Sequence, residues 1–228
     1  MLFWFKCTML IACLLILSIT MPKYILLIFF IVPLQSIAAE LFITITDAAK
    51  KPLPFAVIEL VNDKYPALNA PATAQVIQKD LNFQPFVSIV SQGALVEFPN
   101  LDKTRHHVYS FSPAKVFELR LYSGKPEAPV MFDQAGVVTL GCNIHDNMLA
   151  YLYVSGSQFT AMTNANGEAY FADLPQQEFE MKIWHPWQQE TLPAQAIRIT
   201  TGKQQLVKAL NIVQQDLPGA DKAGFSDY

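Results

Sequence analysis

The chain contains 228 residues, 52% of them hydrophobic, and its 16 basic and 19 acidic residues give a net charge of −3. A mildly acidic chain without a block of basic residues is not expected to bind nucleic acid. Its length suits one large or two small domains, each with a buried core.

The first 39 residues differ in composition from the rest. They contain two lysines and no acidic residue, and an apolar run over 24–34 leads into the small residues of 36–39. A charged start, a short apolar stretch and small residues are typical of a secretory signal peptide. We therefore predict that residues 1–39 are cleaved on export, with Met1 or Met21 as the start. The run over 24–34 and a second apolar run over about 8–20 are each shorter than the roughly 18–20 apolar residues of a spanning helix. We therefore expect no membrane span after cleavage. A retained membrane anchor is the alternative.

The rest of the chain has the pattern of a β protein. Short β-rich runs alternate with turn residues, and almost no segment has a helical pattern. So many short strands predict a β-sandwich or barrel. The expected strands are residues 41–46, 55–61, 75–78, 86–90, 94–98, 108–111, 114–121, 137–140, 148–154, 159–163, 168–172, 178–184, 196–200 and 206–213.

One seven-residue stretch carries distinctive chemistry. Cys142, His145 and Met148 place a thiolate, an imidazole and a thioether at Cys-x-x-His-x-x-Met spacing, and His106 supplies an imidazole upstream. Two imidazoles, one thiolate and a weak axial thioether are the ligands of a type 1 copper site, which cycles between Cu(I) and Cu(II). The other two cysteines lie in the leader, so the exported chain would have one thiol and no internal disulfide. Metal ligation would protect that thiol from the oxidising environment outside the cytoplasm.

Strand alternation predicts the direction of these side chains. Cys142 shares a face with Leu140, so its sulfur is expected on the apolar side of the strand. His106 shares a face with Val108, whereas its neighbour His107 points to the opposite face. This parity, together with the resemblance described next, leads us to expect His106 rather than His107 as the ligand.

Residues 72–155 resemble a cupredoxin, the fold of plastocyanin and amicyanin. The run over 100–106 has the six-residue step from Asn to His of plastocyanin-like domains, and the loop over 142–148 has amicyanin spacing. The phrases over 105–115 and 141–148 also resemble bacterial methylamine utilization proteins.

The cupredoxin resemblance implies a cofactor, a location and an activity. One type 1 copper ion would be bound by His106, Cys142, His145 and axial Met148. The protein would be periplasmic, or anchored in the inner membrane and facing the periplasm. It would exchange single electrons with redox partner proteins whose identity the sequence does not reveal.

Three positions depart from the cupredoxin pattern. His107 stands where many members have Asn, and Asn143 stands where Ser or Thr is common. We hypothesise that these two residues form a substitute hydrogen bond that orients the ligand loops. Leu140 replaces an aromatic residue often found two positions before the cysteine, which concerns the path of electron entry more than metal binding.

Residues 158–213 resemble a second all-β unit, a carboxypeptidase regulatory-like sandwich of the transthyretin type. An opening strand pair for that fold lies at 41–61, ahead of the cupredoxin. Either the cupredoxin is inserted into the second sandwich, or residues 41–61 are the first strands of the cupredoxin itself. The expected fold is therefore all-β, a cupredoxin Greek-key β-sandwich plus this second sandwich. The expected boundaries are 1–39 (signal peptide), 40–71 (N-terminal strands and linker), 72–155 (copper domain), 156–213 (second domain) and 214–228 (disordered tail).

Other chemistries fit less well. Structural zinc sites usually have four Cys or His ligands, and a Cys–His nucleophile would need a third, orienting residue. His185 is expected to cap a strand, with Trp184 and Trp187 as packing residues in a core or seam between domains. We therefore expect a one-electron carrier and not an enzyme. A copper chaperone or sensor, or an interaction protein without metal, are the alternatives.

Overall fold

The computed structural model describes residues 39–68, 73–126, 128–145 and 147–218. The predicted signal peptide lies outside these residues except for Ala39, and the predicted tail lies outside them from residue 219 onward. Every regular element in the described part is a strand, so the predicted all-β fold class is confirmed. No helix long and apolar enough to cross a membrane occurs in these residues.

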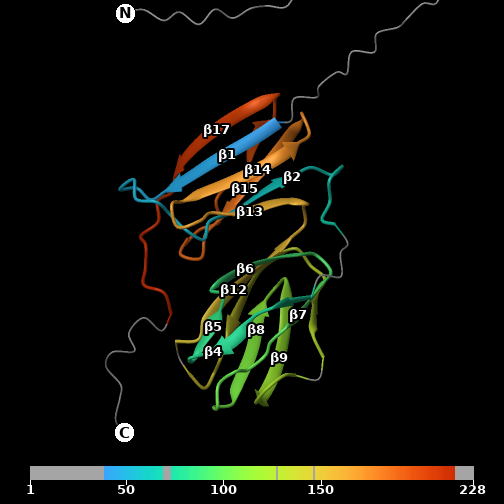
Figure 1. The fold of residues 1–228 in the computed structure, drawn as a ribbon, viewed down its shortest axis with the longest axis vertical. Coiled ribbons are helices and arrows are strands. Elements are labelled where there is room, and N and C mark those ends of the chain that lie inside the picture. The colour runs from blue at the N-terminus through green and yellow to red at the C-terminus, as the bar shows by residue number, and fades with distance from the viewer. Residues whose placement is uncertain (1–38, 69–72, 127, 146, 219–228) are drawn as a thin grey trace, which may run out of the picture. The chain divides into compact units, whose positions relative to one another are not determined.

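The first sandwich is built from the strands between residues 73 and 155 (Figure 1). A five-stranded sheet has the order β6-β12-β11-β8-β9, a three-stranded sheet has the order β10-β7-β3, and β4 pairs with β5 as a hairpin. Their bounds are β3 (Thr73–Gln75), β4 (Ile77–Lys79), β5 (Asn82–Gln84), β6 (Val87–Ser91), β7 (Ala94–Glu97), β8 (His106–Ser112), β9 (Lys115–Tyr122), β10 (Val130–Phe132), β11 (Gly136–Gly141) and β12 (Leu149–Ser155).

The core of the first sandwich contains aromatic and aliphatic side chains from both sheets. Phe98 and Phe132 are almost fully buried, and their cluster includes Leu140, Cys142 and Met148. Two of the four predicted ligands therefore sit at the edge of a dry hydrophobic core. Burial of this kind is the main favourable term in folding the sandwich.

The second sandwich combines strands from both ends of the described chain. One sheet has the order β14-β1-β17 and the other β13-β2-β15-β16. The alternating burial along β1 shows why this sequence forms a half-buried strand, since every second residue faces the core. The bounds are β1 (Ala39–Thr46), β2 (Val57–Val61), β13 (Phe159–Met162), β14 (Glu168–Leu174), β15 (Glu178–Trp184), β16 (Gln195–Arg198) and β17 (Gly202–Ala209).

Strands β1 and β2 pair with strands that follow the first sandwich in sequence. β1 runs antiparallel to β14 and parallel to β17, and Figure 1 shows blue β1 beside red β17. β2 lies antiparallel to β13 and β15. These pairings support the hypothesis that the first sandwich is inserted into the second.

Several elements differ from the sequence predictions. The single strand expected at 75–78 is two three-residue strands, β3 and β4, which belong to different sheets. Strand β5 and strand β10 were not expected, because each has only three residues. The β4–β5 turn also lacks a glycine, and its two residues Asp80 and Leu81 have positive φ angles of 54° and 58°. A turn was expected at 201–203 and a strand at 206–213, whereas β17 runs from Gly202 to Ala209 in continuous register with β1.

A buried carboxylate joins the two sandwiches. Glu59 on β2 is 5% exposed and accepts hydrogen bonds from the hydroxyls of Tyr153 and Ser155, both at 2.9 Å. The backbone N–H groups of Gly156 and Ser157 donate to the same carboxylate at 2.7 and 3.1 Å. Burial and the adjacent Glu59 carboxylate raise the pKa of Tyr153, so its hydroxyl stays protonated as a donor.

Aromatic rings surround this junction. Trp184, at the end of β15, contacts Tyr151 and Tyr153 of β12 with ring centroids 5.4 and 6.0 Å apart. Phe86 contacts both Tyr151 and Trp187. Trp184 and Trp187 therefore pack at the seam between the sandwiches, one of the two places that the sequence predicted. Tilted or edge-on rings at these distances add to the stabilisation that their burial gives.

Candidate metal centre

Cys142 follows directly after β11 and continues its alternation. Leu140 and Val138 are fully buried, Thr139 between them is exposed, and Cys142 itself is 5% exposed. The sulfur therefore lies on the apolar side, as strand parity predicted. A Cβ added to Gly141 would lie 2.8 Å from the ring of Tyr109, so the glycine before the cysteine allows that ring to cover this part of the strand.

His106 is the first residue of β8 and is fully buried. Its Nδ1 lies 3.9 Å from the Sγ of Cys142, and its Nε2 lies 2.9 Å from the Oδ2 of Asp102. Because a carboxylate only accepts hydrogen bonds, Nε2 carries the proton and Nδ1 presents its lone pair toward the sulfur. A carboxylate that fixes the tautomer of a histidine in this way is common behind metal-binding imidazoles.

His145 and Met148 lie in the loop between β11 and β12. The rings of His145 and His106 have centroids 5.0 Å apart and are inclined at 61°. The N–H of Met148 donates to the carbonyl of His145 at 3.1 Å, which closes the loop into a turn. His145 is partly exposed, whereas Met148 is buried in the same cluster as Cys142. All four predicted ligands thus belong to one end of the first sandwich.

The geometry of three of these residues fits a single ion. His106, Cys142 and His145 each offer one ligand atom, and these atoms lie within 4.8 Å of one another. Two ligand atoms bound to one ion at about 2.0–2.3 Å, in a trigonal arrangement, are about 3.8 Å apart, close to the 3.9 Å between Nδ1 of His106 and Sγ of Cys142. A set of one thiolate and two imidazoles has the softness that copper prefers.

The loop before His106 is ordered by Asn100 and Asp102. The side-chain amide of Asn100 donates to the carbonyls of Thr104 and Tyr122, and its Oδ1 accepts the N–H of Asp102 at 2.9 Å. Partial burial alone would raise the pKa of Asp102, but hydrogen bonds from the N–H of Leu81, from His106 and from the N–H of Asp80 outweigh it and lower the pKa overall. The carboxylate beside His106 is therefore ionised at neutral pH.

His107 points away from the metal-site cluster and has a different partner. Its Nε2 lies 2.9 Å from Oε1 of Glu118 on β9, and its ring contacts that of Tyr109. This geometry favours His106 over His107 as the ligand. The hypothesis of a bond between His107 and Asn143 is not supported, because His107 bonds to Glu118 instead. Both residues nevertheless line one surface pocket.

Asp102 and Glu118 are the residues that sequence reasoning missed. Asp102 was recognised only as part of the motif leading to His106, and its role as the partner of Nε2 was not foreseen. The separation of only four residues between Asp102 and His106 was a weak signal of this contact, since the intervening loop could have directed the carboxylate elsewhere. Glu118 had no local signal, because β9 meets β8 only through sheet pairing.

His185 lies outside the cluster and has internal partners at both ring nitrogens. Its Nε2 is 3.0 Å from the carbonyl of Pro54, and its Nδ1 accepts the N–H of Trp187 at 3.2 Å. Burial lowers the pKa of His185 to about 4, so the ring is neutral. His185 directly follows β15 and bonds within the second sandwich, in agreement with the prediction that it caps a strand there.

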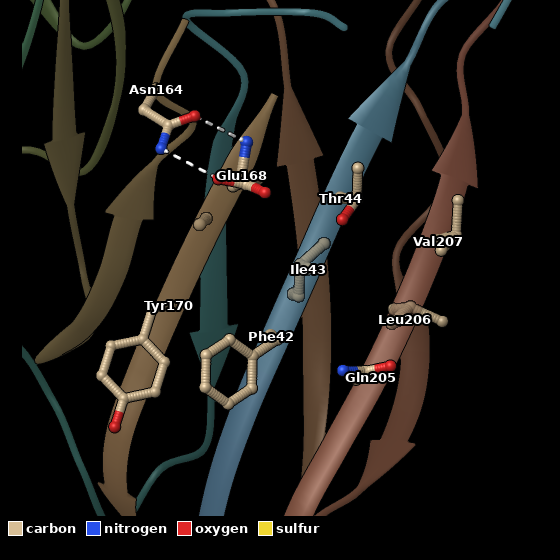
Figure 2. A pocket seen from close by; sticks show the side chains of 10 residues that line it. Phe42, Ile43, Thr44, Asn164, Glu168, Tyr170, Gln205, Leu206 and Val207 are labelled. Atoms are coloured by element: carbon tan, nitrogen blue, oxygen red, sulfur yellow. Dashed lines mark hydrogen bonds between the residues drawn. The ribbon is translucent and has the colours of Figure 1, made fainter. Parts of the chain in front are cut away.

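A pocket on the second sandwich has a different character. Figure 2 shows it on the outer face of β14, β1 and β17, with the rings of Phe42 and Tyr170 side by side. Asn164 bonds to both the N–H and the carboxylate of Glu168 at one end. No cysteine or histidine lines this pocket, so the soft ligands that copper prefers are missing from it.

No family model and no curated protein sequence matches the chain. The chain is similar in fold to the purple cupredoxin of Nitrosopumilus maritimus (21% identity, 36% of this chain, 99% of that chain, TM-score 0.32). It is also similar to amicyanin from Paracoccus versutus (17% identity, 43% of this chain, 97% of that chain, TM-score 0.31).

A third similar structure is the copper-containing nitrite reductase of Thermus scotoductus (22% identity, 39% of this chain, 24% of that chain, TM-score 0.35). The resemblance to methylamine utilization proteins stays a prediction.

Proposed function

We propose that this protein binds one type 1 copper ion in the periplasm and carries single electrons between redox partner proteins. The observation that supports this proposal is the convergence of His106, Cys142 and His145, whose ligand atoms lie within 4.8 Å of one another. A buried thiolate between two imidazoles is suited to both Cu(I) and Cu(II). The copper ion would supply the one-electron change, and the chain would supply its geometry.

Each residue would have a separate role. His106, Cys142 and His145 would hold the ion, and Met148 would be a weaker fourth ligand that tunes the reduction potential. Cys142 and Met148 lie in the hydrophobic core, which keeps water from the sulfur atoms. His145 is the partly exposed member and would be the point of electron exit toward a partner.

The buried and hydrogen-bonded setting of His106 favours an electron carrier over a copper chaperone or sensor. This side chain is fully buried, and both of its ring nitrogens already have fixed neighbours, Asp102 and Cys142. Ligands held in place by surrounding packing rearrange little when the charge of a bound ion changes. A chaperone must release its ion, so it is better served by ligands that move.

The deciding experiment replaces the proposed sulfur ligand. The Cys142→Ser variant is expected to lose the intense visible charge-transfer band of the copper-loaded protein, because a hydroxyl cannot replace the thiolate. The matched control is Asn143→Ser at the adjacent, exposed position, which should keep the band. A Cys142→Ser protein that still shows the band would rule out the proposed ligand set.

Cyclic voltammetry separates carrier from chaperone. A reversible couple with fast electrode kinetics is expected for a carrier, since the ligands stay in place. A slow or irreversible couple in a copper-loaded protein would instead favour storage or sensing.

A further inference from the structure

The Asp102 carboxylate accepts three hydrogen bonds that fix its orientation. Oδ1 accepts the N–H of Asp80 at 2.7 Å, and Oδ2 accepts the N–H of Leu81 at 3.0 Å. Oδ2 also lies 2.9 Å from Nε2 of His106. Backbone amides can only donate, so two of the three interactions hold the carboxylate in place whether or not His106 takes part.

The two amides come from the turn of the β4–β5 hairpin, which is itself anchored. Both turn residues have positive φ angles, 54° and 58°, and their consecutive N–H groups both donate to the carboxylate. Strand β4 of the hairpin is hydrogen-bonded to the loop before His106 through Gln78. The N–H of Gln78 donates to the carbonyl of Pro99, and its carbonyl accepts the N–H of Leu101. The hairpin therefore positions Asp102, and Asp102 in turn positions His106.

From this arrangement we infer that Asp102 is a positioning residue that fixes the His106 tautomer and lowers the reduction potential of the bound copper. The inference rests on the proposed function and deepens it. With Nε2 held as a donor, the Nδ1 lone pair remains directed at the metal position beside Cys142. A bound copper ion would exchange one electron with a one-electron redox protein, while the proton between Asp102 and His106 would stay in place.

The carboxylate also acts through its charge. The side chain of His106 is fully buried and that of Asp102 is 14% exposed, so solvent screens the interaction only in part. A negative charge one imidazole away from the ion stabilises Cu(II) more than Cu(I). A hydrogen-bonded carboxylate also makes the imidazole a stronger donor, which again favours the oxidised ion.

The first measurement needs no metal and no variant. Nitrogen-15 NMR of the metal-free protein reports which nitrogen of His106 carries the proton, and we expect Nε2. A proton on Nδ1 would overturn the inference. This readout is independent of copper binding, so it tests the positioning role even if the proposed function were to fail.

The second measurement is the reduction potential of copper-loaded Asp102→Asn. The change removes the charge at nearly constant shape, and we expect the Cu(I) to Cu(II) affinity ratio to rise about tenfold, or about 59 mV for a one-electron couple. The matched control is Glu118→Gln, which removes a carboxylate bonded to the adjacent His107 rather than to a ligand. The control should shift the potential much less.

Two outcomes distinguish the inference from the proposed function. If Asp102→Asn keeps the visible band but shifts the potential no more than Glu118→Gln, the role of Asp102 is refuted and the copper site stands. If the unchanged protein has no visible band with copper, the proposed function fails. Asp102→Glu, which restores the charge, should return the potential toward that of the unchanged protein; failure to do so also counts against the inference.

Discussion

The two sandwiches bury polar side chains in different ways. In the second, Glu59 accepts four hydrogen bonds and His185 has a partner at each ring nitrogen. In the first, Nδ1 of His106 and Sγ of Cys142 face each other and the ring of His145 beside them. Buried groups whose hydrogen bonds are met within the chain hold a structure together, whereas a thiol and two imidazoles that converge on one point form a place for a soft cation.

The physical reason for this difference is the cost of burying polar atoms. An unpaired buried donor or acceptor costs about 1–3 kcal/mol, so a protein keeps such atoms only where another interaction compensates. Around Glu59 the compensation comes from within the chain. His106, Cys142 and His145 instead bring soft ligand atoms within 4.8 Å of one another, an arrangement that suits a metal ion. Three predictions test that contrast.

The largest effect is expected from a comparison of the two adjacent histidines. His106→Ala should abolish the visible band and lower copper affinity by more than about 100-fold. Replacement of a residue that only hydrogen-bonds to a metal ligand already lowers metal affinity by about 10–100-fold, so loss of a ligand should cost more. His107→Ala should retain the band, because this side chain bonds to Glu118. Titration of the metal-free proteins with copper measures both affinities. Equal losses in the two variants would contradict the assignment of His106.

Replacement of the carboxylate that joins the sandwiches should reduce stability without changing the site. Glu59→Gln places an amide N–H among four donors, and we expect the free energy of unfolding to fall by about 2–4 kcal/mol. Urea denaturation measures this change, and the band of the folded, copper-loaded variant should be unaltered.

The matched control for Glu59 lies on the same sandwich. Glu40 accepts a bond from the Tyr170 hydroxyl in an exposed position, so Glu40→Gln should cost less than about 1 kcal/mol. Similar costs at both positions would show that burial of Glu59 contributes nothing.

The smallest effect concerns His185 and pH. Burial lowers its pKa from 6.5 to about 4, so the unfolded chain binds a proton below pH 6.5 that the folded chain does not bind until about pH 4. Stability is therefore complete above pH 6.5 and decreases as the pH falls toward 4, by about 2 kcal/mol between pH 7 and pH 4.5. His185→Gln, which cannot be charged, should lose less stability over that interval in urea denaturation. An identical pH dependence in both proteins would remove His185 as the cause.

Much of the candidate site could be predicted because its signals are local. The Cys-x-x-His-x-x-Met spacing lies within one loop, and strand alternation is a period of two residues that requires no knowledge of neighbours. Burial of Leu140 and Cys142 on one face followed from that alternation alone. The choice of His106 over His107 had the same origin, and the observed neighbours of the two rings favour it.

The sequence by itself determined which thiol, imidazole and thioether side chains could bind a metal, their faces and the all-β class, because these depend on residue chemistry and on short periods along the chain. Tertiary structure alone decided that β1 pairs with β17, about 160 residues away in sequence, and that Asp102 meets both a hairpin turn and His106. Such contacts depend on how whole surfaces fit together. Nothing in the local sequence encodes which distant donor will reach a given carboxylate, so only the folded chain reveals what supports the site.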